Sequence, residues 1–535
     1  MSTETQNSVE TFDAQAVNKK ENRDLYESRK KIHPKRTNGW FRQFKWGVMI
    51  LTLGIYYITP WLRWDRGEYA PDQAVLLDMA NRRFYLFFIE IWPHEFFYVA
   101  GLLVMAGIGL FLVTSSVGRA WCGYSCPQTV WVDLFLVVER FFEGDRNQRI
   151  KLDAARMDLN KFRKRASKHI VWILISITTG GAWIFYFADA PTLFVELFTG
   201  QAAFVAYATV AVLTMTTYVF GGFMREQVCT YICPWPRIQA AMLDENSLTV
   251  TYNDWRGEPR TKHAKKAKRE GESVGDCVDC NACVAVCPMG IDIRDGQQLE
   301  CITCALCIDA CDSVMSKIGL DQGLISYSTL AIYDANMAFA SAANKNMAAN
   351  SEEGFSIADM AAIDPEKVRD DSGKLFSHFL HASWRTVVRL RTIIYSTIYC
   401  LIGLALIVSL LTRSNLDVNV LHDRNPIFVT LSDGSIRNGY EIRILNMVAK
   451  PSRFTVHLEG IPNAFVKIAG DDKNLGQEFS IDVDPDKLRA TRIYITLPKH
   501  DITGTNMKFR LVVNRQSDNE EAIYDANFVA PKGAK

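Results

Sequence analysis

The chain has 535 residues, enough for several domains, and a formal net charge of +1. A balance this close to neutral gives no reason to expect a strongly acidic or strongly basic partner. Of its 13 cysteines, all but Cys400 lie at short spacings, and none follows residue 400. This distribution excludes a disulfide-rich secreted domain and predicts metal ligands in a reducing compartment.

Hydrophobic residues make up 48% of the chain, and many lie in segments about as long as a bilayer is thick. A membrane-spanning helix needs roughly 20 apolar residues. Five segments approach that length and predict five transmembrane helices: 46–62, 96–116, 170–187, 202–222 and 393–411. The apolar stretch 84–92 is too short to cross and is predicted to be an interfacial or re-entrant helix.

Basic residues indicate the direction of these spans, because cytoplasmic loops are enriched in Lys and Arg. The tail before the first span ends in a basic stretch, 30–45, and the loop after the second span is basic from 140 to 168. The loop 188–201 contains no Lys or Arg. The N-terminus is therefore predicted to be cytoplasmic. With an odd number of spans, the chain after residue 412 lies on the opposite side.

These spans divide the chain into five predicted parts: the cytoplasmic tail 1–45, the first four spans 46–222, a cytoplasmic ferredoxin-like insertion with a linker 223–391, the fifth span 392–412, and an outer domain 413–535. Within the insertion, the basic stretch 262–269 is interpreted as a solvated or lipid-facing segment. We expect no nucleic-acid partner.

Two matching motifs follow the second and fourth spans, "CGYSCP" at 122–127 and "CTYICP" at 229–234. Each places two cysteines four positions apart, so in a continuous helix both thiols would lie on one face, about one turn apart. Pro127 and Pro234 are suited to begin or kink the next helix. Because the second and fourth spans run in the same direction, we expect four thiols to converge at the cytoplasmic surface: Cys122, Cys126, Cys229 and Cys233.

Several uses of these four thiols are open. Thiolates are soft ligands that favour Cu(I), zinc or an iron–sulfur centre. The thiols could instead cycle between dithiol and disulfide, or simply be small buried hydrophobic residues. The matched duplication favours a chemical role, as copper-handling or redox thiols or as ligands of a further metal centre.

The strongest signal lies between residues 277 and 311. The runs "CVDCNACVAVCP" and "CITCALCIDACD" both have the cysteine spacing of bacterial two-cluster ferredoxins, in which the fourth ligand of each cluster comes from the other run. A pair of zinc sites is disfavoured, because zinc usually joins two well-separated CxxC pairs. The predicted [4Fe–4S] ligands are Cys277, Cys280, Cys283 and Cys311 for cluster one, and Cys301, Cys304, Cys307 and Cys287 for cluster two.

From about residue 415 the pattern changes to short alternating strands such as "YEIRIL", "RFTVHLE" and "RIYITL". Turn signals at Asp433-Gly434 and Asn438-Gly439 separate some of them. About seven strands predict an immunoglobulin-like β-sandwich with a docking or scaffolding role. The predicted fold is thus a multi-domain membrane protein with a five-helix transmembrane bundle, a bacterial-type two-cluster ferredoxin insertion and a C-terminal all-β domain.

The chain resembles the CcoG/FixG/RdxA family of membrane polyferredoxins, the cytochrome c oxidase accessory proteins. The resemblance runs from about residue 26 into the C-terminal domain and is carried by "CGYSCPQTVWVDLFLVVERFFEGDRNQRIKLD", "REQVCTYICPWPRIQAAMLDENSLTVTYNDWRGEPR" and "GDCVDCNACVAVCPMGIDIRDGQQLECITCALCIDAC". The family more often has Gln-Asp where this chain has His94-Glu95, which leaves the role of His94 open.

The resemblance implies a protein of the bacterial inner membrane, with its N-terminus in the cytoplasm and its immunoglobulin-like domain in the periplasm. It implies reduction of Cu(II) to Cu(I) for maturation of the cbb3-type cytochrome c oxidase. Two [4Fe–4S] clusters on the eight cysteines and copper-handling thiols at the two CxxxCP motifs are implied with it. The implied partners are oxidase assembly factors and copper chaperones. The oligomeric state is open, with a homodimer among the options.

No glycine-rich dinucleotide fingerprint follows a predicted strand, so we expect the electron donor to be a separate protein or the quinol pool. Three functions remain in competition. The first is an oxidoreductase, a cupric reductase that serves oxidase maturation. The second is a quinol-linked electron-transfer polyferredoxin. The third is an assembly scaffold with structural clusters.

Overall fold

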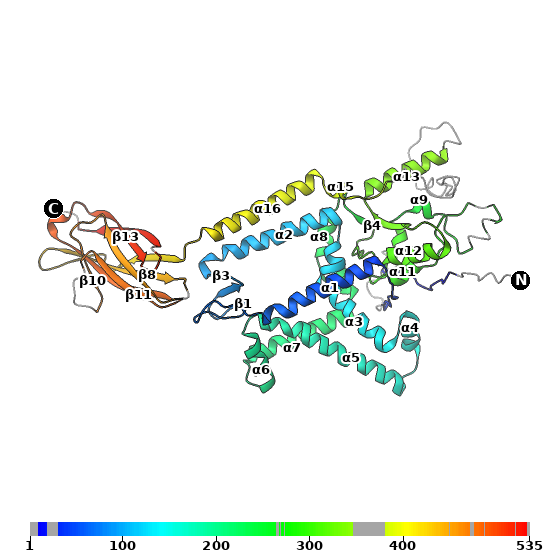
Figure 1. Ribbon diagram of the computed structural model, residues 1–535, viewed down its shortest axis with the longest axis horizontal. Coiled ribbons are helices and arrows are strands. Elements are labelled where there is room, and N and C mark those ends of the chain that lie inside the picture. Colours follow the sequence, from blue (N-terminus) through cyan, green and yellow to red (C-terminus); the bar gives the residue numbers. More distant parts are fainter. Residues whose placement is uncertain are drawn as a thin grey trace. The chain divides into compact units, whose positions relative to one another are not determined.

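The computed structural model describes residues 9–18, 30–263, 267, 269–271, 273–345, 380–448, 450–470, 476–485, 487–518 and 520–531. The chain forms two compact units (Figure 1). The first comprises Met1–Leu62, Val75–Tyr85 and Glu90–Leu404, and contains the long helices and the cysteine-rich region. The second comprises Arg63–Ala74, Leu86–Ile89 and Ala405–Lys535, and contains the C-terminal β-domain.

Among the described residues, four helices are long and apolar enough to cross a membrane. They are α2 (Phe97–Val117), α5 (Leu159–Gly180) with the 3₁₀ turn Gly181–Tyr186, α7 (Phe204–Tyr218) with the π-helical turn Val219–Met224, and α16 (Leu390–Leu411). The chain is therefore a multi-domain membrane protein.

The predicted count of five spans is not supported. The first predicted span lies in α1 (Trp40–Ile58), whose first turns carry Arg42 and Lys45 and are too polar for a spanning segment. Both cations are buried against Asp133 of α3 (Pro127–Glu143), with nitrogen–oxygen distances of 3.0 and 3.1 Å. The start of α1 is thus adapted to a polar protein environment, and only its later part is continuously apolar.

The interfacial helix predicted for 84–92 is wrong. The chain there forms β2 (Arg83–Leu86) and β3 (Ile89–Ile91), and β2 pairs with β3 on one side and with β1 (Val75–Asp78) on the other in a three-stranded sheet. Phe87, between the two strands, adopts a positive φ of 53°, which reverses the chain. His94 is exposed in the short 3₁₀ turn Pro93–Glu95 that follows.

The cysteine-rich region is built from short elements around two longer helices. Its only described sheet pairs β4 with β5, antiparallel. Its elements are α8 (Trp235–Met242), β4 (Thr249–Tyr252), α9 (Asp254–Gly257), α11 (Ala282–Val286), α12 (Leu306–Ile318), β5 (Ile325–Ser328) and α13 (Leu330–Lys345). Most of the predicted linker lies in 346–379, outside the described residues. The remaining α-helices among the described residues of this unit are α4 (Arg146–Ala154), α6 (Ala190–Thr199) and α15 (Trp384–Val387).

The C-terminal unit is a two-sheet β-sandwich, as predicted. One sheet has the order β10-β12-β8-β6, with β7 also paired to β8, and the other has the order β11-β9-β13-β14. Between them lies a core that includes Ile442, Phe454, Leu511 and Phe528, all 0% exposed. The strands are β6 (Leu416–His422), β7 (Val429–Thr430), β8 (Ile436–Asn446), β9 (Ser452–Glu459), β10 (Phe465–Ile468), β11 (Glu478–Val483), β12 (Leu488–Leu497), β13 (Asn506–Arg515) and β14 (Glu521–Val529).

The turn predicted at Asp433-Gly434 is confirmed, since Gly434 has φ 82° and Leu431 and Ser435 close the turn with a hydrogen bond of 2.9 Å. The turn predicted at Asn438-Gly439 is wrong. Both residues lie inside β8, where the buried Asn438 side chain donates to the carbonyl of Val529 at 3.0 Å.

Candidate metal centres

The eight clustered cysteines lie around the starts of α11 and α12. Cys277, Cys283, Cys304 and Cys311 are buried, and the other four are half-buried. The two runs have the same local backbone, because Asp279 and Asn281 in the first and Thr303 and Ala305 in the second all adopt positive φ between 45° and 59°. Such strained conformations in non-glycine residues concentrate at functional sites.

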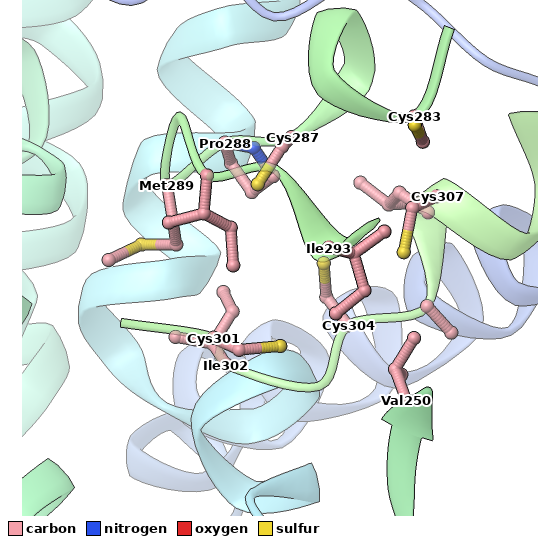
Figure 2. A pocket seen from close by; sticks show the side chains of 13 residues that line it. Val250, Cys283, Cys287, Pro288, Met289, Ile293, Cys301, Ile302, Cys304 and Cys307 are labelled. Carbon is pink, nitrogen blue, oxygen red and sulfur yellow. The ribbon is translucent and has the colours of Figure 1, made fainter. Parts of the chain in front are cut away.

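One cavity of about 390 Å³ gathers thiols from both runs. Figure 2 shows Cys287 of the first run around the same space as Cys301, Cys304 and Cys307 of the second. Burial, followed by the adjacent Cys304 and Cys301 thiols, raises the pKa of Cys287 to about 12. Cys287 therefore lies among the second run, as the crossed ligand pattern requires.

Cys311 shows the reciprocal arrangement. Burial raises its thiol pKa well above the usual value, and the next largest causes are Cys283, Cys277 and Cys280 of the first run. Protonated thiols must lose their protons to bind a metal, so metal binding here is coupled to proton release.

The donor set fits two [4Fe–4S] clusters. Among the described residues, no group of three or more Cys, His, Asp or Glu side chains is gathered closely enough to hold a single metal ion. A cubane needs a wider set, since each of its thiolates binds a different iron atom. Eight soft thiols from the two runs meet that need.

The two CxxxCP motifs form π-helical turns, Trp121–Ser125 and Val228–Ile232, so the continuous α-helix considered from the sequence does not run through them. The amide of Cys126 donates to the carbonyl of Trp121 at 2.9 Å, and that of Cys233 donates to Val228 at 2.8 Å. Each second cysteine then leaves the helix in an extended conformation. Pro127 begins α3 as predicted, and Pro234 is the residue just before α8.

The two motifs converge. A cavity of about 370 Å³ is lined by Cys122, Cys229 and Cys233, together with Arg119. Cys126 belongs to the same group, because after burial it is the largest cause that raises the pKa of Cys229 to about 12. We call Cys122, Cys126, Cys229 and Cys233 the four-thiol site.

The four-thiol site adjoins the cluster-two cavity, since Met289 and Ile302 line both. The first motif packs directly on the cluster-two loop. A methyl group at Gly123 would lie 2.7 Å from the carbonyl oxygen of Ile302. The hydroxyl of Tyr124 donates to the carbonyl of Cys304 at 3.2 Å.

A segment of the N-terminal tail that was not predicted to lie here completes the region. We call residues 9–18 and 30–39 the N-terminal strap. The amide of Phe12 donates to the carbonyl of Cys280 at 2.9 Å, and that of Val17 donates to Gly290 at 2.8 Å. Phe12 is buried, and the Lys35 ammonium lies 3.7 Å from its ring centre. The one sequence signal for this contact is the presence of apolar Phe12, Ala14 and Val17 in an otherwise polar tail.

Family models match three parts of the chain. A 4Fe-4S dicluster domain matches residues 224–330, a 4Fe-4S binding domain matches residues 99–143, and the IG-like fold at the C-terminal of FixG matches residues 406–531. The first contains all eight ferredoxin cysteines, and the second contains the first CxxxCP motif.

Three curated relatives align with most of the chain. The nitrogen fixation protein FixG of Rhizobium meliloti is 59% identical over 531 residues, which cover 99% of this chain and 98% of that protein. Protein RdxB of Cereibacter sphaeroides is 52% identical and covers 84% and 88%, and protein RdxA of the same organism is 49% identical and covers 91% and 94%. This chain is therefore an iron–sulfur electron-transfer protein of the membrane and belongs to the FixG/RdxA family.

Proposed function

We propose that this chain reduces Cu(II) to Cu(I) at the four-thiol site and that it serves the maturation of a cbb3-type cytochrome c oxidase. The observation that supports this most directly is the wall of Met289 and Ile302 shared by the cluster-two cavity and the four-thiol cavity. Bound [4Fe–4S] clusters supply electrons one at a time, which is what reduction of Cu(II) requires.

We propose the crossed ligand sets for the two clusters. Cluster one would be held by Cys277, Cys280, Cys283 and Cys311, and cluster two by Cys287, Cys301, Cys304 and Cys307. The reciprocal positions of Cys287 and Cys311 support this division.

The chemistry of the four-thiol site suits Cu(I), a soft ion that prefers thiolate ligands. Burial and the neighbouring Cys126 raise the pKa of Cys122 to about 12, so copper binding would release its proton. The Cys122 thiol donates to Oε1 of Gln239 at 3.1 Å, and Gln239 is itself 0% exposed and donates to Thr114 at 3.3 Å. Gln239 is therefore placed to orient the Cys122 thiol and to hold its proton.

We propose the predicted topology, in which the apolar stretch 46–62, from the later part of α1 onward, is a fifth span. The strap and four-thiol site then lie in the cytoplasm, and the β-sandwich lies in the periplasm of a bacterial inner membrane. The basic residues of the tail and of the loop after α3 support this orientation. The proposed partners are copper chaperones and oxidase assembly factors, with a separate electron donor.

The test uses full-length protein prepared without oxygen, reduced with dithionite and freed of excess reductant. Mixed with a Cu(II) salt and a Cu(I)-specific chelator that colours on binding, the wild type should form Cu(I) while its reduced clusters reoxidise and regain their visible absorbance. Cys122→Ser and Cys229→Ser should keep their iron but react more slowly by about tenfold or more. Cys400→Ser is the control, since Cys400 is exposed in α16 and lines neither cavity. Serine variants as fast as wild type would place copper reduction elsewhere.

The role in the cell has its own test. Deletion of the gene should lower cbb3 oxidase activity, and added copper should restore it if the missing step is the supply of Cu(I). Loss that copper does not restore would contradict the copper role.

A second candidate function is favoured by an open cavity between α1, α5, α6 and α7. Its lining is aromatic and apolar, and includes Tyr57, Trp61, Phe194 and Phe198. Such a cavity suits the ring and tail of a quinol, so a quinol-linked electron-transfer role is the alternative. Reduction of the clusters by a soluble quinol analogue, blocked by Ala182→Phe in the cavity wall, would favour it.

A further inference from the structure

Arg119 lies between the two cavities. It follows α2 and precedes the first π-helical turn, and it is only 4% exposed. Its guanidinium donates to the carbonyl of Leu299, to that of Cys301 at 3.2 Å and to that of Pro236 at 2.7 Å. One side chain thereby ties the end of α2 to the cluster-two loop and to the start of α8.

The charge of Arg119 has no carboxylate partner within ion-pair distance in the described part of the chain. Its electrostatic neighbours are the thiols of Cys301 and Cys122, followed by Glu300. The guanidinium Nε is buried without a hydrogen-bond partner, and Arg119 lines the four-thiol cavity. A buried cation without a counter-charge is costly. Thiolate ligands of both sites would supply the missing negative charge.

We propose that Arg119 is a positioning residue that couples cluster two to the four-thiol site, an inference that rests on the electron route of the proposed function. Its hydrogen bonds fix the Cys301 loop against the first motif, and its positive charge favours added negative charge at cluster two. Hydrogen bonding, net charge and burial are the factors by which a protein sets the reduction potential of an iron–sulfur cluster.

The test compares Arg119→Met with Arg119→Lys in full-length protein, by redox titration of both clusters followed by electron paramagnetic resonance. Arg119→Met should lower the reduction potential of one cluster by about 59 mV. For a one-electron couple this shift corresponds to a tenfold change in the equilibrium constant for reduction. Arg119→Lys keeps the charge and should leave the potential near the wild-type value. Both variants should slow the electron step to Cu(II), because lysine cannot bond three carbonyls in the same fork.

Arg294 provides a matched control. Its side chain is 7% exposed and donates to Asp279, Asn281 and Asp292 at 2.8, 2.7 and 2.7 Å. Its charge interacts with Asp292 first, followed by the cluster-one thiols of Cys283 and Cys277. Arg294→Met should shift the other cluster and leave the Arg119-sensitive one in place. Exposed Arg453→Met, in the C-terminal unit, should shift neither.

Equal potentials in wild type and Arg119→Met would overturn the inference, as would an Arg119→Lys potential shifted as far as that of Arg119→Met. If Arg119→Met fails to retain iron, the inference is tested on the Arg119→Lys variant instead. An Arg119→Lys protein that retains iron and has the wild-type reduction potential supports the electrostatic role. An Arg119→Lys protein that loses iron shows that Arg119 only holds the fold. The reduction potentials are measured without copper, so this titration tests Arg119 independently of the copper assay. A wild type that fails to reduce Cu(II) would contradict the proposed function only.

Discussion

Gly123 marks the closest approach between the first motif and the ferredoxin fold. A β-carbon there would meet only backbone, namely the carbonyl of Ile302 at 2.7 Å and the α-carbon of Cys304 at 3.1 Å. Backbone cannot rotate aside as a flexible side chain can. The glycine is therefore required by the contact and not by its own dihedral angles.

We expect Gly123→Ala to separate the first motif from the cluster-two loop and to destabilise this unit by about 1–3 kcal/mol, the usual cost of overpacking. The electron step to Cu(II) should slow while iron content stays near normal. Stopped-flow absorbance and iron analysis measure the two effects. Gly107→Ala is the control, since Gly107 lies in α2 with open space around it. Equal rates in both variants would show that the close contact is not needed.

The crossed ligand sets make a second prediction at this scale. Cys287→Ser and Cys304→Ser should remove the same resonance signal and about half of the iron, because each would lose cluster two. Cys311→Ser and Cys280→Ser should both remove the other signal. Iron analysis with electron paramagnetic resonance checks the pairing. If Cys287→Ser removed the same resonance signal as Cys280→Ser, each run would hold its own cluster.

Among the elements, α1 depends on the ferredoxin fold for its first turn. Its N-cap residue is Gly39, which has no side chain to accept the free amides. Asp309 of α12, between two predicted ligands, accepts from the amides of Phe41 and Arg42 at 3.2 and 2.8 Å. A carboxylate from a distant helix thus caps a helix that leads towards the membrane.

Asp309→Ala should lower the free energy of unfolding by about 0.5–2 kcal/mol through loss of this cap. Asp309→Asn should cost less, because an amide oxygen also accepts from free amides. Thermal unfolding in detergent, followed by tryptophan fluorescence, measures the difference. If Asp309→Asn lost as much unfolding free energy as Asp309→Ala, the effect would come from the charge of Asp309 and not from capping.

Element boundaries that depend on local pattern were predictable, and those set by distant partners were not. The cysteine runs, the long helices and most of the sandwich follow from spacing and periodicity. Asn438-Gly439 looks like a hairpin turn, yet β14 supplies the Val529 carbonyl that holds Asn438 inside a strand. The stretch 84–92 is apolar enough for a helix, but sheet pairing with β1 decided its conformation.

The same limit applies to the site. All twelve clustered cysteines were predicted from spacing, because ligand spacing is local. Arg119 was not singled out, since a basic residue after a span usually serves only to orient it. Its role depends on the carbonyls of Leu299, Cys301 and Pro236, far along the chain. The π-helical turns were missed because the spacing of four also suits an α-helix.

At the scale of the whole molecule, the N-terminal strap links the first residues to the cluster loops. Its second part is held by α4, where Nε2 of His33 lies 3.1 Å from Asp153. That carboxylate would favour a charged imidazole. Burial opposes it, followed by the cations of Lys31 and Arg149, and together they lower the pKa of His33 to about 3. His33 is therefore neutral when the strap is docked.

Docking of the strap should weaken in acid. A histidine with a lowered folded-state pKa stabilises the fold fully above about pH 6.5, and this contribution is lost as pH falls from there towards 3. Between pH 7 and pH 5 the loss is about 2 kcal/mol. Hydrogen exchange of residues 30–39, corrected for intrinsic rates, should show less protection at the lower pH. His33→Gln should remove the difference, and a pH effect that survives it must come from another group.

The strap also fixes an order of events during synthesis. Residues 9–18 leave the ribosome long before residues 280–290, whose carbonyls accept their hydrogen bonds, have been made. The strap therefore cannot dock during the early part of translation, and its contact with the cysteine loops forms only after nearly 300 residues have been joined.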